Sequence, residues 1–321
     1  MAISKKQWLA VAREATAGTL QSAPTVWVPG KAKFKNVKKR NYTPEDRGTR
    51  DANYTVTDGV RHAEGELSGD WYNDTVPYFL LGFMGIDTAS QPNSATYPTV
   101  WSHAFTLADI PLPLDFWKSY DSEVYSMSYH VVSKFTLKWQ AMDKNLEYTA
   151  STQGHPFTKI TSPSFTPSYS SILPFTGYSP TISLNGTQSS DIEEMQIDLE
   201  QKIELWYPSA GSSDFATIYF GERTAKIDYT ARFDNDVNFL KYTTSPGLDD
   251  HINVAFQGAL IASTYYESLA LDFPIVGYDD VEQDDSKNNI NIKAKCTARP
   301  GTTANSLFSA TIQNTVASYA I

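Results

Sequence analysis

The sequence predicts a mainly β protein: a β-sandwich or open barrel built from two similar units per chain, each flanked by a short α-helix, with long loops and arms. Three observations predict this class. Apolar and polar residues alternate with period two, aromatic residues reach 13% of the chain, and one strand-and-helix segment occurs twice. With 321 residues, 41% of them hydrophobic, the chain can bury a large core.

The alternation is clearest in EMQIDLEQKIELWY, residues 194–207, where Met195 and Ile197 point to one face and Asp198 and Glu200 to the other. The same pattern predicts further strands over residues 54–71, 124–140, 146–152, 215–223, 225–233, 250–262, 267–275, 288–298 and 305–316. So many alternating strands predict sheets that pack face to face.

A short helix is predicted in WYNDTVPYFLLGFMG, residues 71–85. Asn73 or Asp74 offers an N-cap, apolar residues then recur at helical spacing, and Gly82 and Gly85 end the helix.

A weaker copy, FDNDVNFLKY, occurs at residues 233–242, with Asp234 to Asp236 as capping candidates. WYND aligns with FDND, and each copy lies between alternating strands. This repeat predicts two units, expected over residues 1–175 and 176–321. Residues 158–190 are rich in Ser, Thr and Pro, which predicts an extended connection between the units.

Charge is unevenly distributed along the chain. The formal net charge of −10 disfavours a surface that grips nucleic acid. GKAKFKNVKKRN, residues 30–41, is nevertheless basic. Three interpretations remain open: a solvated loop, a nucleic-acid contact, or a loop that meets an acidic face of another copy in a heterologous contact. The acidic surroundings favour the third over the second.

Motifs for catalysis are missing from the sequence, so we expect no enzyme, no cofactor and no metal. The five histidines do not form an H-E-x-x-H motif, and no glycine-rich nucleotide loop occurs. Cys296 stands alone, so no disulfide framework can form within the chain. The acidic run at residues 278–289 could offer Ca²⁺ ligands, but a solvated turn is favoured because EF-hand spacing is absent. Those candidate ligands are Asp279, Asp280, Glu282, Asp284 and Asp285.

Membrane insertion is also not expected. MAISKKQWLA lacks the apolar core of a secretory signal, and the longest apolar run is too short to cross a bilayer. We therefore expect synthesis and folding in a reducing cytoplasm.

Four segments, taken together, resemble a known family. They are VAREATAGTLQSAPTVWVP near the start, DRGTRDANYTVTDGVRHAEGELSGDWYNDTVPYFLLGFMG, LALDFPIVGYDD, and LFSATIQNTVASY near the end. Their order is similar to that of the tail tube proteins of long-tailed, non-contractile bacteriophages, in the larger variety of about 300 residues. The resemblance spans nearly the whole chain.

The resemblance implies a structural protein of the virion tail, made in the bacterial host. Such proteins stack as rings of β-rich tube domains around a lumen through which genome DNA passes without tight binding. The implied partners are further copies of the chain and the tape measure, tail terminator and distal tail proteins. The family's helix would match Asn73 to Met84, and its long loop Lys31 to Arg50. If each unit is one tube domain, three chains form a pseudo-hexameric ring; otherwise six chains form a hexamer.

The resemblance also suggests site residues. A lumen lined with carboxylates repels phosphates and lets DNA slide, so the polar strand faces are the expected lining. The candidate lumen residues are Glu64, Glu66, Asp70, Asp198, Glu200 and Glu204. The candidate contacts between rings or subunits are Lys31, Lys33, Lys35, Lys38, Lys39, Arg40, Arg47 and Arg50.

A second function class is a carbohydrate- or receptor-binding β-sandwich of a virion. Exposed aromatic rings would then stack on sugars, with Trp71, Trp101 and Trp117 as candidates. The simpler interpretation, which is favoured, places these residues in the core.

Overall fold

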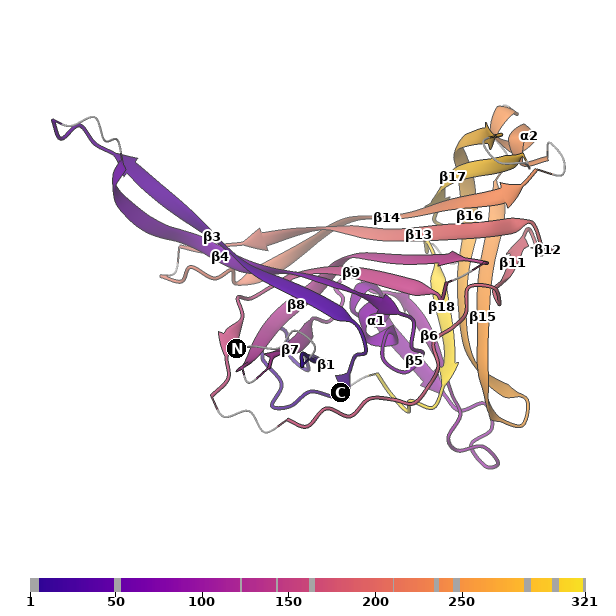
Figure 1. Cartoon of the computed structure of the whole chain (residues 1–321), viewed down its shortest axis with the longest axis horizontal. Coiled ribbons are helices and arrows are strands. Elements are labelled where there is room, and N and C mark those ends of the chain that lie inside the picture. The colour runs from indigo at the N-terminus through magenta and orange to yellow at the C-terminus, as the bar shows by residue number, and fades with distance from the viewer. Residues whose placement is uncertain are drawn as a thin grey trace.

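The computed structural model describes residues 6–48, 53–121, 123–142, 144–161, 165–209, 211–233, 237–244, 249–285, 290–301 and 306–319. Within these ranges the chain forms eighteen strands and two short helices, which confirms the mainly β class (Figure 1).

The elements divide at residue 160. The first half contains β1 (Leu9–Arg13), β2 (Val26–Trp27), β3 (Lys31–Pro44), β4 (Asn53–Asp70), α1 (Pro77–Met84), β5 (Gly85–Ser90), β6 (Trp101–Leu107), β7 (Leu114–Tyr120), β8 (Glu123–Gln140), β9 (Glu147–Gly154) and β10 (Thr158–Lys159). The second half contains β11 (Thr181–Leu184), β12 (Thr187–Ser189), β13 (Ile192–Trp206), β14 (Thr217–Arg232), α2 (Val237–Thr243), β15 (Asp250–Ala262), β16 (Tyr265–Asp284), β17 (Asn291–Arg299) and β18 (Ser309–Asn314).

One antiparallel sheet runs through both halves in the order β3-β4-β9-β8-β13-β14-β17-β16. β8 and β13 join its two halves, with Thr136 opposite Asp198. Residues that alternate along these strands lie on opposite faces, so one face of the sheet is apolar and the other polar. We call the solvent-facing side the polar face.

The strand pairings of the first half recur in the second. β3-β4-β9-β8 corresponds to β13-β14-β17-β16. The first part of β8 pairs with β7, as the first part of β16 pairs with β15. β1 joins β2 to β7, and β11 joins β12 to β15 in the same way. The β5–β6 pair and β18 are additions, and β18 ties β16 to β6.

Both halves also carry a β-bulge at the corresponding place. In β8 the register shifts between Val132 and Lys134, and in β16 between Tyr278 and Asp280. Each bulge lies near the point where the strand changes partner. A bulge bends a strand and increases its twist, which directs the two parts of the strand toward different partners.

The apolar face of the sheet packs on α1 and on the apolar residues of β7 and β15, such as Phe116 and Phe256. All eight residues of α1 are buried. Side chains from both halves share one continuous core; for example, the rings of Trp139 and Phe256 lie edge to face at 5.1 Å. The core therefore holds the two halves in one body.

The predicted start of the first helix is wrong. α1 begins at Pro77 with Val76 at the N-cap position and no side-chain cap. The Asn73 side chain instead accepts a hydrogen bond from Trp71 (3.2 Å) and donates one to Glu267 (2.7 Å). The first turn of a helix tolerates proline, because a backbone N–H at that position would have no partner within the helix.

The end of that helix also differs in part from the expectation. Gly85 ends α1 with a φ of +100°, which glycine adopts easily. Gly82 lies inside the helix, where a Cβ would come within 2.8 Å of Leu114 Cδ1. Its role is close packing. The capping candidates 234–236 of the second helix lie outside the described residues.

Several predicted boundaries shift. The strands expected over 215–223 and 225–233 form the single strand β14, and the strand expected over 267–275 continues to Asp284. The basic run is a strand, β3, and not a loop. The connection expected over 158–190 is interrupted by the β11–β12 hairpin.

Candidate assembly surface

The polar face brings the acidic candidates of both halves onto one surface. Alternation along β4 and β13 places on this face Glu64, Glu66, Asp70, Asp198, Glu200 and Glu204. One row of paired residues crosses five strands, and it connects the two sets: it consists of Lys33, Glu66, Ser151, Lys134 and Glu200.

Lysines occupy the same face as the acids, and sequence reasoning missed most of them. They are Lys31, Lys33, Lys35, Lys134, Lys138, Lys202, Lys226, Lys293 and Lys295. They lie chiefly on β3, β8 and β17, whereas β4, β13 and β16 carry carboxylates. The polar face therefore consists of stripes of opposite charge, and the alternation that located the acids would have located these lysines too.

Ion pairs neutralise part of this cationic charge. Lys134 Nζ lies 2.6 Å from Glu200 and 3.4 Å from Asp198. The hydrogen bond to Glu200 raises the pKa of Lys134. Partial burial raises the pKa of Asp198. Hydrogen bonds from Thr136 and Gln196 and the charge of Lys134 together lower it by a larger amount, so the pKa lies below the usual value. Both groups are thus held in their charged forms.

The last acidic run pairs with neighbouring cations. Lys295 lies 2.9 Å from Asp280, and Lys293 lies 2.6 Å from Asp284. Thr297 donates a hydrogen bond to Asp279. In the described part of the chain, no three His, Cys, Asp or Glu residues gather as a metal site.

The strand β3 presents most of the basic candidates. Lys31, Lys33 and Lys35 are exposed on the polar face beside β4. Further out, Lys38 pairs with Asp58 at 2.6 Å, and Lys39 and Arg40 are exposed.

The hairpin of β3 and β4 continues beyond the body of the protein as an arm (Figure 1). Near its tip, Tyr42 and Val56 pair across the strands and are 57% and 52% exposed. At its base, Arg61 forms an ion pair of 2.5 Å with Asp214. The arm is thus anchored at its base and carries one exposed pair of large hydrophobic residues near its tip.

One of the remaining two basic candidates, Arg47, follows the last residue of β3 by three positions. Arg47 bonds Glu45 and lies 4.7 Å from the Tyr54 ring, while Arg50 lies outside the described residues.

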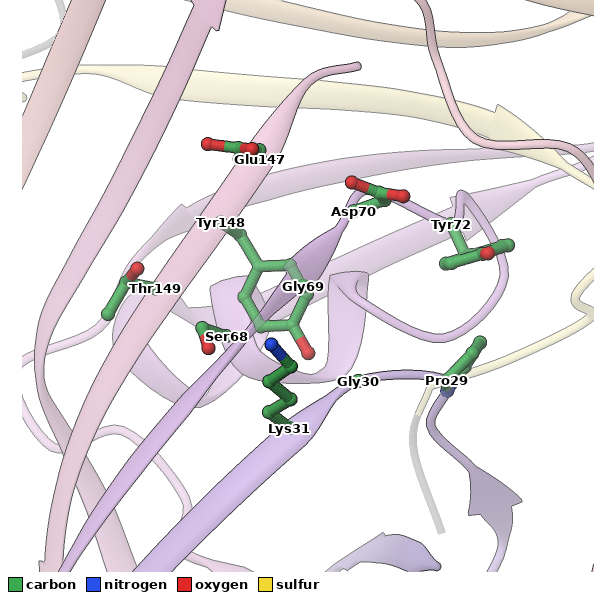
Figure 2. Close-up of a pocket in the computed structure, with 10 residues that line it drawn as sticks. All are labelled: Pro29, Gly30, Lys31, Ser68, Gly69, Asp70, Tyr72, Glu147, Tyr148 and Thr149. Atoms are coloured by element: carbon green, nitrogen blue, oxygen red, sulfur yellow. The ribbon is translucent and has the colours of Figure 1, made fainter. Parts of the chain in front are cut away.

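A cavity of about 460 Å³ lies where β3, β4 and β9 meet. Lys31, Asp70 and Glu147 belong to its wall, and Figure 2 shows Lys31 pointing toward Tyr148. The Tyr148 hydroxyl is buried without a hydrogen-bond partner among the described groups. Gly30 and Gly69 also line it, and a Cβ at Gly30 would come within 2.9 Å of the Ser68 carbonyl oxygen, so the close approach of these segments requires glycine.

The tryptophans proposed for sugar stacking do not form an exposed platform. Trp71 is 0% and Trp117 is 1% exposed, and Trp101 is half-buried. The simpler interpretation, that they are core aromatics, holds for Trp71 and Trp117.

Sequence reasoning also missed a buried carboxyl pair. Glu14, on the resemblance segment near the start, accepts hydrogen bonds from the backbone N–H of Gly18 (2.6 Å) and of Tyr129 (2.5 Å). Asp115 accepts one from Gln21 (2.6 Å), and its other oxygen receives none. Burial, followed by the neighbouring Glu14, raises the pKa of Asp115 well above its usual value. No sequence motif signals this contact, because the two residues are distant in the chain.

Comparison with known proteins agrees with the architecture. No curated protein matches the sequence. None of the described helices has the length and apolar character that a membrane span requires. The family model described as phage tail tube protein matches residues 5–313, nearly the whole chain, and the chain therefore belongs to the phage tail tube protein family.

Proposed function

We propose that this protein polymerises as stacked rings into the tail tube, and that its polar face lines the conduit through which the genome is ejected into the host. The sheet of eight strands carries this proposal. It has one buried face, one polar face, and two ends at which no further described strand pairs. Such a sheet is a segment of a barrel, since closure across subunits removes exposed strand edges.

The repeated pairings support two tube-type units, residues 1–175 and 176–321. Three chains would then supply the strands of six four-stranded units, in a ring with pseudo-sixfold symmetry. With strands about 4.8 Å apart and tilted by about 40°, such a barrel would be about 150 Å around and about 48 Å across between backbones. This width leaves room for a DNA duplex inside the side chains.

The lining is electronegative in this proposal. Lys134, Lys293 and Lys295 are already paired with carboxylates on the same face. Glu64, Glu66 and Glu204 remain at the surface as acids. In this proposal these exposed acids repel the phosphates along the conduit.

The arm would contact the adjacent ring. It reaches past the body, carries exposed cations, and has an apolar pair near its tip. Reversal of Lys38, Lys39 and Arg40 to glutamate should then prevent stacking while single rings still form. The reversal of Lys144 alone, which is exposed and off the arm, is a control for a surface charge change elsewhere and should leave stacking unchanged. Normal stacking of the triple variant would contradict this role.

Electron microscopy of the purified protein, alone or with tail initiation proteins, tests the proposal. Tubes with a regular axial repeat are expected, and a persistent monomer would contradict it. The mass of one isolated ring then distinguishes three chains from six. The tape measure, tail terminator and distal tail proteins are the expected partners at the inside and ends of the tube.

A further inference from the structure

The two ends of the eight-stranded sheet are open edges of opposite charge. β3 pairs with β4 alone, and the end of β16, residues 278–284, pairs with β17 alone among the described strands. Unpaired edge strands offer backbone N–H and C=O groups to another strand. On the polar face, β3 carries Lys31, Lys33 and Lys35, and β16 carries Asp280, Glu282 and Asp284. Within the described residues, neither Lys35 nor Glu282 has an ion-pair partner.

The chain already contains one junction of this kind, between β8 and β13. Thr136 stands opposite Asp198 in antiparallel pairing, and Lys134 opposite Glu200 with a 2.6 Å ion pair. A basic strand that ends the first unit therefore meets an acidic strand that begins the second. This junction supplies a template for the next one.

The pairings transfer the register of this junction from one unit to the other. Ser68 and Thr230 each lie three residues before the aromatic residue of the repeated motif, Trp71 and Phe233. The chain of partners in the first unit is Lys31, Ser68, Thr149 and Thr136. The chain of partners in the second unit is Glu194, Thr230, Lys293 and Glu282.

Two equivalences follow from these chains of partners. Glu282 occupies the position of Thr136. Lys35, four residues after Lys31, occupies the position of Asp198, four residues after Glu194. No register shift interrupts β3 or β13 in these stretches, and the corresponding bulges of β8 and β16 keep the faces aligned.

We propose that β16 of one chain pairs antiparallel with β3 of a second copy, with Glu282 opposite Lys35 and Asp284 opposite Lys33 of that copy. The inference rests on the proposed function and specifies its contact between subunits. The charges are complementary, but their order is reversed from the internal junction: an acidic strand ends one chain and a basic strand begins the next. Contacts between two β3 edges or two β16 edges are disfavoured by like charges. The contact is heterologous and therefore builds a ring in one direction.

A disulfide test reads this register directly. The double variant K35C/E282C, oxidised after assembly, should form covalent multimers whose largest member equals the number of chains in the ring. The native Cys296 is 1% exposed and contributes little background. The control K31C/E282C places the thiols four residues out of register, about 13 Å apart along the strand, and should remain uncross-linked.

The outcomes separate this inference from the function on which it rests. Multimers from K35C/E282C and not from the control support the register. Regular tubes without cross-links, or with equal cross-links in both variants, overturn it and leave the tube function standing. A protein that forms neither rings nor tubes overturns both.

Charge exchange provides a second measurement that does not depend on thiols. K35E and E282K should each weaken ring formation, and the double variant should restore it. Failure of the double variant to exceed either single variant would contradict the pairing.

Discussion

The buried pair of Glu14 and Asp115 leads to a prediction about pH and stability. Both side chains are fully buried, and Glu14 is committed as an acceptor to two backbone N–H groups. When the unpartnered oxygen of Asp115 carries a proton, this carboxyl group can donate a hydrogen bond to Glu14. Without that proton, two negatively charged carboxylates would lie next to each other. Ionisation of Asp115 is therefore suppressed in the folded protein. The substitution D115N should preserve this arrangement without a titrating group, because its amide also donates.

The magnitude follows from proton linkage. The folded pKa of Asp115 is raised and the unfolded value is about 3.9, so between these values the folded state holds one more proton. Wild-type stability then falls with rising pH by about 1.4 kcal/mol per unit relative to D115N. Because burial and the neighbouring Glu14 raise the pKa of Asp115 to about 9, the advantage of D115N should grow by roughly 3 kcal/mol from pH 5 to pH 7. Urea unfolding of both proteins at pH 5, 6 and 7 measures this difference.

The other titrating groups contribute equally to the stability of wild type and of D115N, so their effects cancel in the difference between the two proteins. Burial lowers the pKa of His130 to about 3, which gives the wild type an opposite slope below pH 6.5, but D115N shares it. E14Q serves as the control, since its amide would face two N–H donors and destabilise the protein at every pH. A D115N advantage that stays constant across this range would refute the shared proton.

Three further predictions follow from the structure. Burial, opposed by the hydrogen bond from Asn73, raises the pKa of Glu267 to about 7. In urea unfolding, the stability of E267Q relative to wild type should therefore rise with pH from about 4.5 to 7 and then level off. A difference that does not change with pH would contradict this. G82A should cost about 1–3 kcal/mol in the same assay, because its Cβ would press on Leu114, and an unchanged midpoint would show that the site has room. The triple variant E64K/E66K/E204K should leave tubes intact by microscopy but slow DNA release from particles. Unchanged release would argue against a lining role for these three residues.

Local alternation predicted much of the sheet because burial follows it closely. Met195, Ile197 and Leu199 are buried while Glu200 is exposed, as a period of two requires. The repeated motif directly follows β4 and β14, and the strand pairings around its two copies correspond, while the division into two tube-type units stays a prediction. The same signal was present but overlooked in KAKFKNVK, where Phe34 is buried between exposed lysines.

Features that depend on distant residues could not be predicted in this way. Asn73 has a strong preference for N-caps, yet its contact with Glu267, far along the chain, determines its orientation. The pairing of β8 with β13 and the contact of Glu14 with Asp115 likewise depend on which segments meet after folding. The six acidic candidates lie at polar strand positions, and whether they face a lumen remains a prediction.

In the proposed ring, the internal junction of β8 with β13 limits which parts can exchange. In a ring of three chains every second junction is intramolecular, so its strands meet at an effective concentration set by the chain and avoid the loss of translational freedom that separate subunits incur on association. Only the junctions between chains are open to dissociation. The attraction between the exposed charges at these junctions weakens as ionic strength rises. The smallest piece that such a ring releases into solution is thus a whole chain of two units, never a single one.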